Sequence, residues 1–249
     1  MAVPDEKQLR VIEKILTFTR KAPNKVKRHE VASVQGTIQH LTFVCRAGHL
    51  FLPPLSAFLA NFPNDYVSHH VPCCVLTSLS WWLNLLRHPP IRRSLSLLPL
   101  LDKDIWVDAS SSWGIALVVN HRWAAWRLVS GWMSDGRDIG WVEAVALEMA
   151  TIWLSETDHH DARVVVRCDN VSVIDAFHKG RSQNTHRNAC LMRISSILAL
   201  ANLVLIPMYV SSDFNKADPI SRGKANYDQS RLLPPIQVPC VLSPFLVSF

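Results

Sequence analysis

The sequence predicts an α/β fold with a mixed sheet in its second half, preceded by a helical region. Arg163–Cys168 is rich in valine, which is typical of a buried strand. Trp113–Val119 is a β-type run, Arg122–Val129 alternates, and the short Asn120–His121 link between them predicts a hairpin. Asp138–Ser155 is apolar on nearly every side, as in a helix buried against a sheet. A hairpin combined with helical crossovers indicates a sheet with antiparallel and parallel neighbours.

For residues 1–100 the sequence predicts helices and no strands. Apolar residues recur near helical spacing in four stretches, Lys7–Thr19, His29–Cys45, Leu55–Asn61 and Leu76–Leu86. Pro89 and Pro90 mark the end of the last one. The region offers no catalytic constellation. It does contain residues that can bind zinc, in two adjacent pairs: His69, His70, Cys73 and Cys74. Adjacent ligands suit a tetrahedral site poorly, so we do not expect zinc there.

Residues 103–223 predict strands and helices in the order β-β-β-α-β-α-α-β. The first strand is Asp104–Asp108, ahead of the hairpin. After the valine-rich strand come helices at Asn170–His178 and His186–Asn202 and a final strand at Leu203–Val210. Residues 224–249 are rich in proline and show no periodicity, so we expect a poorly ordered tail.

Composition sets broad limits on function. Hydrophobic residues make up 49% of the 249 residues, enough for a sizeable core. The net charge of +6 is compatible with a polyanionic partner, although many proteins without one are as basic. Met1–Arg10 is charged and does not resemble a secretory signal, and no long apolar run predicts a membrane span. Six cysteines form no regular framework, so we expect an intracellular, reduced protein, in the nucleus or the cytoplasm.

Two aspartates end apolar strands. Asp108 follows Ile-Trp-Val, and Asp169 follows Val-Val-Val-Arg-Cys. A charge at the end of a hydrophobic strand is unfavourable unless it is compensated, and a cation between two carboxylates would relieve their repulsion. Oxygen ligands favour Mg²⁺ or Mn²⁺. The alternative is that each Asp only forms a turn or caps a helix, which suits Asp169 because a predicted helix follows it.

A third carboxylate comes from the buried helix. Glu143 and Glu148 are the two charges in its Trp141–Leu154 stretch, about 140° apart around the axis, so they cannot share one site. We favour Glu143, because the helix dipole stabilises an anion in the first turns. A fourth candidate follows the last strand, where Asp213 and Asp218 occur. The alternative for Asp218 is that it opens a short helix with Pro219 at the first position.

Four segments together resemble the ribonuclease H domain of retroelement reverse transcriptases, above all those of fungal DIRS-like (tyrosine-recombinase) elements. They are Val107-Asp-Ala-Ser, Trp141-Val-Glu-Ala-Val-Ala-Leu, Arg167-Cys-Asp-Asn and Asn215-Lys-Ala-Asp-Pro-Ile-Ser-Arg. A weaker resemblance, over Val26–Ala60, is to the thumb or connection that follows a polymerase palm. The family usually has one more residue between the Asn and the last Asp, and its His loop is not recognisable near Ser211–Ser212.

The resemblance implies a ribonuclease H-like fold, a five-stranded mixed sheet flanked by helices. It implies metal-dependent cleavage of the RNA strand of RNA–DNA hybrids, with two Mg²⁺ (or Mn²⁺) ions held by four acidic residues, Asp108, Glu143, Asp169 and Asp218. The alternates Glu148 and Asp213 remain open. An inactive nucleic-acid-binding or interaction remnant is the alternative function.

Partners follow from the same resemblance. The sequence has no Tyr-x-Asp-Asp motif, so a polymerase domain would be a partner outside this chain. Lys179, Arg181 and Arg187 surround a polar loop and are candidate phosphate contacts. The alternative for these three is a solvated basic turn.

Overall fold

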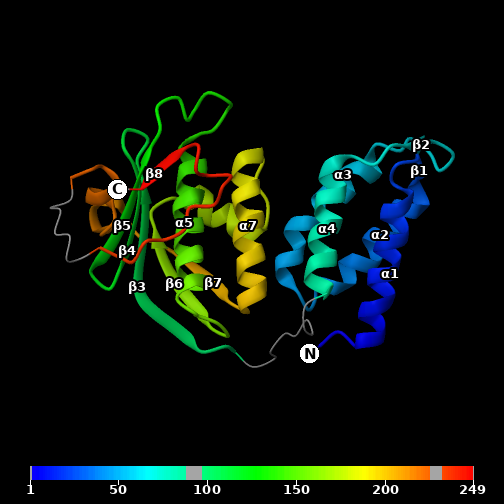
Figure 1. Cartoon of the computed structure of the whole chain (residues 1–249), viewed down its shortest axis with the longest axis horizontal. Coiled ribbons are helices and arrows are strands. Elements are labelled where there is room, and N and C mark those ends of the chain that lie inside the picture. Colours follow the sequence, from blue (N-terminus) through cyan, green and yellow to red (C-terminus); the bar gives the residue numbers. More distant parts are fainter. Residues whose placement is uncertain (1, 88–96, 225–231, 249) are drawn as a thin grey trace. The chain divides into compact units, whose positions relative to one another are not determined.

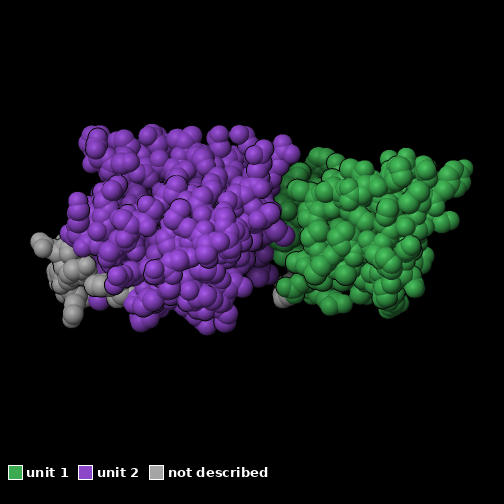
Figure 2. Space-filling model, turned by 90° about the horizontal axis from the view of Figure 1, so that it is seen from above, with its two compact units in different colours: residues 1–97 green, residues 98–249 purple. Residues whose placement is uncertain are grey.

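The computed structural model describes residues 2–87, 97–224 and 232–248. The chain forms two compact units, unit 1 (residues 1–97) and unit 2 (residues 98–249), which are coloured separately in Figure 2. None of the described helices is long and apolar enough to cross a membrane.

Unit 1 is helical, as the sequence predicts. Its helices are α1 (Asp5–Lys21), α2 (Arg28–Leu41), the 3₁₀ helix η1 (Arg46–Phe51), α3 (Pro53–Ala60) and α4 (Cys73–Arg87). Each α-helix buries an apolar stripe, for example Val31, Val34 and Ile38 on α2. Two short strands that the sequence did not predict, β1 (Val26–Lys27) and β2 (Ser68–His69), pair antiparallel.

Unit 2 is a mixed α/β structure built on one six-stranded sheet. The strands are β3 (Leu100–Ala109), β4 (Gly114–Val119), β5 (Arg122–Leu128), β6 (Arg163–Cys168), β7 (Val204–Tyr209) and β8 (Leu246–Ser248). They lie in the order β7-β6-β3-β4-β5-β8. The pairs β3–β4, β4–β5 and β5–β8 are antiparallel, whereas β3–β6 and β6–β7 are parallel.

The predicted hairpin forms between β4 and β5. Its two turn residues, Asn120 and His121, have φ angles of 47° and 66°. Positive φ at both central residues is the backbone of a type I′ turn, whose twist matches that of the two strands it joins. The hairpin therefore has the register that pairs Val119 with Arg122.

Helix α5 (Ile139–Glu156) fills the centre of unit 2. Every residue from Gly140 to Leu154 is buried, which explains why the sequence is apolar around the whole helix. The helix packs on β3 and β4 and against α7 (Thr185–Ala201), and Figure 1 shows α5 and α7 on the same side of the sheet. Helix α6 (Val171–Lys179) follows β6 directly and ends at Gly180 in the left-handed conformation.

The opposite face of the sheet carries a second apolar cluster, which is covered by the segment after β7. That segment contains the 3₁₀ helix η2 (Ser212–Phe214) and α8 (Asp218–Ser221). Ala217 and Ile220 from this segment pack against Trp106, Val118 and neighbouring side chains of the sheet. The segment is thereby fixed close to the ends of β3 and β4.

The sheet has one strand more than the five that the sequence predicts. The sixth strand, β8, comes from the tail that we expected to be poorly ordered. Between residues 232 and 248, Ile236, Leu242 and Leu246 are buried, and Leu246 pairs with Leu128 of β5. The described part of the tail therefore belongs to the core of unit 2, because burial of a few apolar side chains stabilises its packing against the sheet.

Candidate metal centre

Three carboxylates from distant parts of the sequence meet at one end of the sheet. Asp108 is the next-to-last residue of β3, and Asp169 directly follows β6. These strands are parallel neighbours whose register pairs Trp106 with Arg167, so two residues further on Asp108 lies beside Asp169. Glu143 reaches the same place from the first turns of α5. One oxygen from each of the three lies within 4.8 Å of the others.

The surroundings of Glu143 disfavour its charged form. Its side chain is only 7% exposed, and its Oε2 atom is buried without a hydrogen-bond partner. Burial, together with the charges of Asp108 and Asp169, raises the pKa of Glu143 to about 9. A buried carboxylate oxygen with no donor is unfavourable, and a bound cation would satisfy it.

Asp108 is also buried, at 2% exposed. Burial raises its pKa to about 7, helped by repulsion from Asp169 and Asp218 and opposed by a hydrogen bond from Ser221. Its Oδ1 accepts a hydrogen bond from the Asn215 side chain, and its Oδ2 accepts one from the Ser221 hydroxyl. Asp108 is therefore both desolvated and fixed in orientation.

Asp169 does not cap the helix that follows it. The N-cap of α6 is Asn170, whose side-chain oxygen accepts a hydrogen bond from the Val173 amide. Asp169 is half-buried, and its Oδ2 accepts a hydrogen bond from the Ser212 hydroxyl at 2.6 Å. The carboxylate is therefore free to face Asp108 and Glu143, so the helix-cap alternative does not describe it.

Asp218 lies near this centre but outside the group of three. It is the first residue of α8, with Pro219 next, as the alternative interpretation proposed. Its Oδ1 accepts a hydrogen bond from Arg222 Nε at 2.7 Å, which raises the pKa of Arg222 further. An open pocket of about 230 Å³ lies here, lined by Ser212, Asp213, Asn215, Asp218, Pro219 and Arg222. Asp213 itself is exposed at the pocket.

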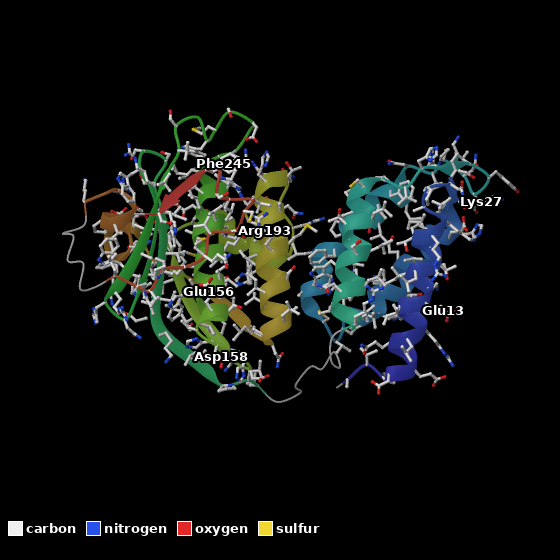
Figure 3. All side chains as sticks on the ribbon, in the orientation of Figure 1. Glu13, Lys27, Glu156, Asp158, Arg193 and Phe245 are labelled. Carbon is white, nitrogen blue, oxygen red and sulfur yellow. The ribbon has the colours of Figure 1, made fainter. Side chains whose placement is uncertain are left out.

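Glu148 belongs to a different environment. It is fully buried and forms two hydrogen bonds with the Arg193 guanidinium of α7, at 2.6 and 2.8 Å; Arg193 is labelled in Figure 3. Burial raises the pKa of Glu148, and the Arg193 charge opposes that shift. Glu143, rather than Glu148, is the helix carboxylate that joins Asp108 and Asp169.

The three predicted phosphate contacts differ from one another. Lys179 is exposed and paired with Asp175 at 3.3 Å, and Arg181 is exposed. The Arg187 side chain is only 15% exposed, because it bonds internally to Ser172 at 2.7 Å and to Asp138 at 3.2 Å. Arg187 thus ties the start of α5 to the first turn of α6, the two helices that border the carboxylates.

The donors around the carboxylates were not predicted. Ser212, Asn215 and Ser221 all come from the segment after β7. The available signal was the mostly polar segment Ser211–Ser221, which fits neither strand nor helix periodicity and follows a strand in the same sheet as the acidic residues. Such a run predicts a loop with side-chain hydrogen bonds but not the partners of those bonds.

The donor set fits a hard divalent cation. It consists of three carboxylates, one of which has a buried oxygen with no partner, and oxygen-only ligands suit Mg²⁺ or Mn²⁺. Among the residues that the structure describes, this is the one group of three or more potential metal ligands, so His69, His70, Cys73 and Cys74 form no such group. No protein-family model and no curated protein matches this chain.

Proposed function

We propose that unit 2 is a ribonuclease H-like nuclease of retroelement origin that cleaves the RNA strand of RNA–DNA hybrids with divalent metal. One observation carries the proposal: Asp108, Glu143 and Asp169 converge at one end of the sheet, with a Glu143 oxygen buried and without a partner. Three carboxylates held together in this way are unfavourable without a cation, because like charges at short distance repel one another.

The arrangement of strands also supports the proposal. The resemblance implies a five-stranded mixed sheet flanked by helices. Strands β3 to β7 form such a sheet, with the β4–β5 hairpin and the parallel pairs β3–β6 and β6–β7, and the helices α5, α6 and α7 accompany it. The acidic residues from the first three resembling segments meet, as a metal site requires. An RNA–DNA hybrid as substrate, a polymerase domain as partner and an intracellular location are parts of the same proposal.

The residues of this chain would hold the metal and position the substrate. Asp108, Glu143 and Asp169 are the ligands that the geometry offers, with Asp218 available if it leaves Arg222. Bound Mg²⁺ would supply an activated water and stabilise the leaving oxygen of the phosphodiester. Exposed Lys179 and Arg181 would contact the phosphate backbone, and the 2′-hydroxyl would mark the RNA strand.

A cleavage assay on an RNA–DNA hybrid with Mg²⁺ tests the proposal. Asp169→Asn and Glu143→Gln should each lower the rate by about 100-fold or more, because even outer groups around a metal contribute up to about that factor. Glu148→Gln is the matched control on the same helix and should keep its activity. A parent protein that binds metal but leaves the hybrid intact would contradict the nuclease function.

The contacts of Asp218 favour a second candidate, a non-catalytic nucleic-acid-binding or interaction remnant. The carboxylate that should complete the metal site is paired with Arg222 instead. In this case hybrid binding would weaken with salt, because phosphate contacts release counterions, while no cleavage would occur. Hybrid cleavage by Arg222→Ala separates the two candidates: cleavage with Mg²⁺ would support the nuclease, whereas salt-dependent binding without cleavage would support the remnant.

A further inference from the structure

The carboxylate of Asp108 is held at both of its oxygens by donors from one short segment, residues 215–221. We infer that Asn215 and Ser221 are positioning residues, which fix the Asp108 carboxylate in the orientation that binds the cation. The inference rests on the proposed metal-dependent function and assigns a task in it to two residues that are not themselves ligands.

The amide of Asn215 can take only one orientation. Its Oδ1 accepts a hydrogen bond from the Ala217 amide at 3.1 Å, which identifies the oxygen end. Its Nδ2 then donates to Asp108 Oδ1 and to the carbonyl oxygen of Val107, each at 3.1 Å. The side chain is 4% exposed and uses both of its Nδ2 protons. Asn215 therefore acts as a donor toward Asp108 and not as a ligand.

Ser221 completes the arrangement from the other oxygen. It is fully buried, and its hydroxyl faces both Asp108 Oδ2 and the carbonyl oxygen of Asp218, the latter at 3.0 Å. A hydroxyl has one proton, and the carboxylate is the closer acceptor and forms the stronger, charge-assisted bond. We therefore assign the proton to Asp108.

One donor on each oxygen fixes the plane of the Asp108 carboxylate and leaves each oxygen able to accept a further contact. Each carboxylate oxygen accepts about two hydrogen bonds or metal contacts. Asn215 and Ser221 take one each, so each oxygen keeps an acceptor site for a cation shared with Glu143 and Asp169. The same bonds stabilise the charged form of a carboxylate that is otherwise desolvated.

Anchoring of the segment alone does not explain this arrangement. The bond from Asn215 to the Val107 carbonyl already holds the segment to β3, and its bond with Ala217 lies within the segment. The additional bond to Asp108, and the independent bond from Ser221, act on the carboxylate. A purely structural role predicts a loss of stability only, whereas a positioning role also predicts a loss of metal affinity in the folded protein.

Titration calorimetry of the full chain with Mn²⁺ decides between the two roles. Ser221→Ala and Asn215→Ala should each weaken Mn²⁺ binding by about 10- to 100-fold, the range for groups that orient metal ligands. Thr151→Val is the control, because Thr151 is also fully buried on α5 but donates to the Leu147 carbonyl at 2.9 Å. It should lose stability and keep the parent's affinity.

The variants are first compared by circular dichroism and thermal unfolding. Ser221→Ala removes a single oxygen atom, so it decides the question if Asn215→Ala does not fold. Folded Ser221→Ala with the parent's Mn²⁺ affinity would overturn the inference, as would a parent that binds no Mn²⁺. A parent that binds Mn²⁺ and cuts no hybrid would overturn the nuclease function instead, while a weakened Ser221→Ala would still support the positioning role.

Discussion

At the scale of single residues, Glu143 and Glu148 show how one helix buries two carboxylates with different partners. They lie five positions apart on α5 and therefore point in different directions. Glu148 faces the Arg193 guanidinium, whereas Glu143 faces two other carboxylates and has an oxygen without a partner. The helix dipole, on which the sequence argument relied, is a weaker reason than this difference in surroundings.

The two positions should respond in opposite ways to loss of charge in metal-free protein. The folded pKa of Glu143, about 9, lies above its ordinary value, so at pH 7 ionisation favours the unfolded state. Glu143→Gln should therefore raise the free energy of unfolding, by about 1–3 kcal/mol. Glu148→Gln should lower it, because Arg193 loses its charged partner. Urea unfolding in EDTA measures both, and a destabilised Glu143→Gln would contradict the argument.

The surface pair of Asp102 and Arg167 gives a pH-dependent prediction. The Arg167 guanidinium lowers the pKa of Asp102 to about 2, so this stabilisation is present above the ordinary pKa of 3.8 and is lost as the pH falls toward 2. The Asp102 side chain is 44% exposed, so solvent screens the pair. Asp102→Asn should lower the free energy of unfolding by under about 1 kcal/mol at pH 7. The difference from the parent should shrink below pH 4 and in 1 M salt; a difference that grows there would contradict it.

At the scale of helices and strands, sequence periodicity predicted most elements because it reflects local packing. The predicted strand Arg163–Cys168 has the observed bounds, and the buried helix differs by one residue at each end. Because β3 and β6 are parallel neighbours, the sequence could predict that Asp108 and Asp169 lie at the same end of the sheet. Strand β8 could not be predicted, since it is three residues long and pairs with β5, far away in the sequence.

Side-chain contacts across distant segments set the limit of prediction in the site. Arg187 bonds to Ser172 and Asp138, 15 and 49 residues away in the sequence, although it was expected to contact phosphate. These contacts depend on loop geometry and on rotamers, which apolar periodicity does not encode. Asp108 and Asp169 were predictable because the ends of two neighbouring parallel strands determine where they lie.

Strand β8 should be structural despite its length. Leu246 is 5% exposed and pairs with Leu128, whereas its neighbour Val247 is 57% exposed. Leu246→Ala should lower the free energy of unfolding by about 2–5 kcal/mol, because it removes buried methyl groups and leaves a cavity. Val247→Ala, on the exposed side of the same strand, is the control and should change it by less than about 0.5 kcal/mol. If chemical denaturation gave the same change in the free energy of unfolding for Leu246→Ala and Val247→Ala, the tail would add nothing to the core.

At the scale of the whole molecule, the chain is two compact units, each with its own buried core. Unit 1 buries large side chains such as Ile38, Leu79 and Trp82, and unit 2 buries Ile105, Leu117 and Leu147. All three carboxylates of the candidate metal centre belong to unit 2. Stabilisation by a bound cation should therefore be a property of unit 2, and a core mutation in unit 1 should not alter it.

Scanning calorimetry of the full chain checks this separation. Mn²⁺ at 100 times its dissociation constant should stabilise unit 2 by about 2.7 kcal/mol, because a ligand that binds only the folded state shifts the unfolding equilibrium by mass action. Ile38→Ala should lower the stability of unit 1 by about 2–5 kcal/mol and thereby identify its transition. The Mn²⁺ effect on the other transition should persist in Ile38→Ala and vanish in Asp169→Asn. An equal rise of both transitions, or a rise that survives Asp169→Asn, would place the cation outside the three carboxylates.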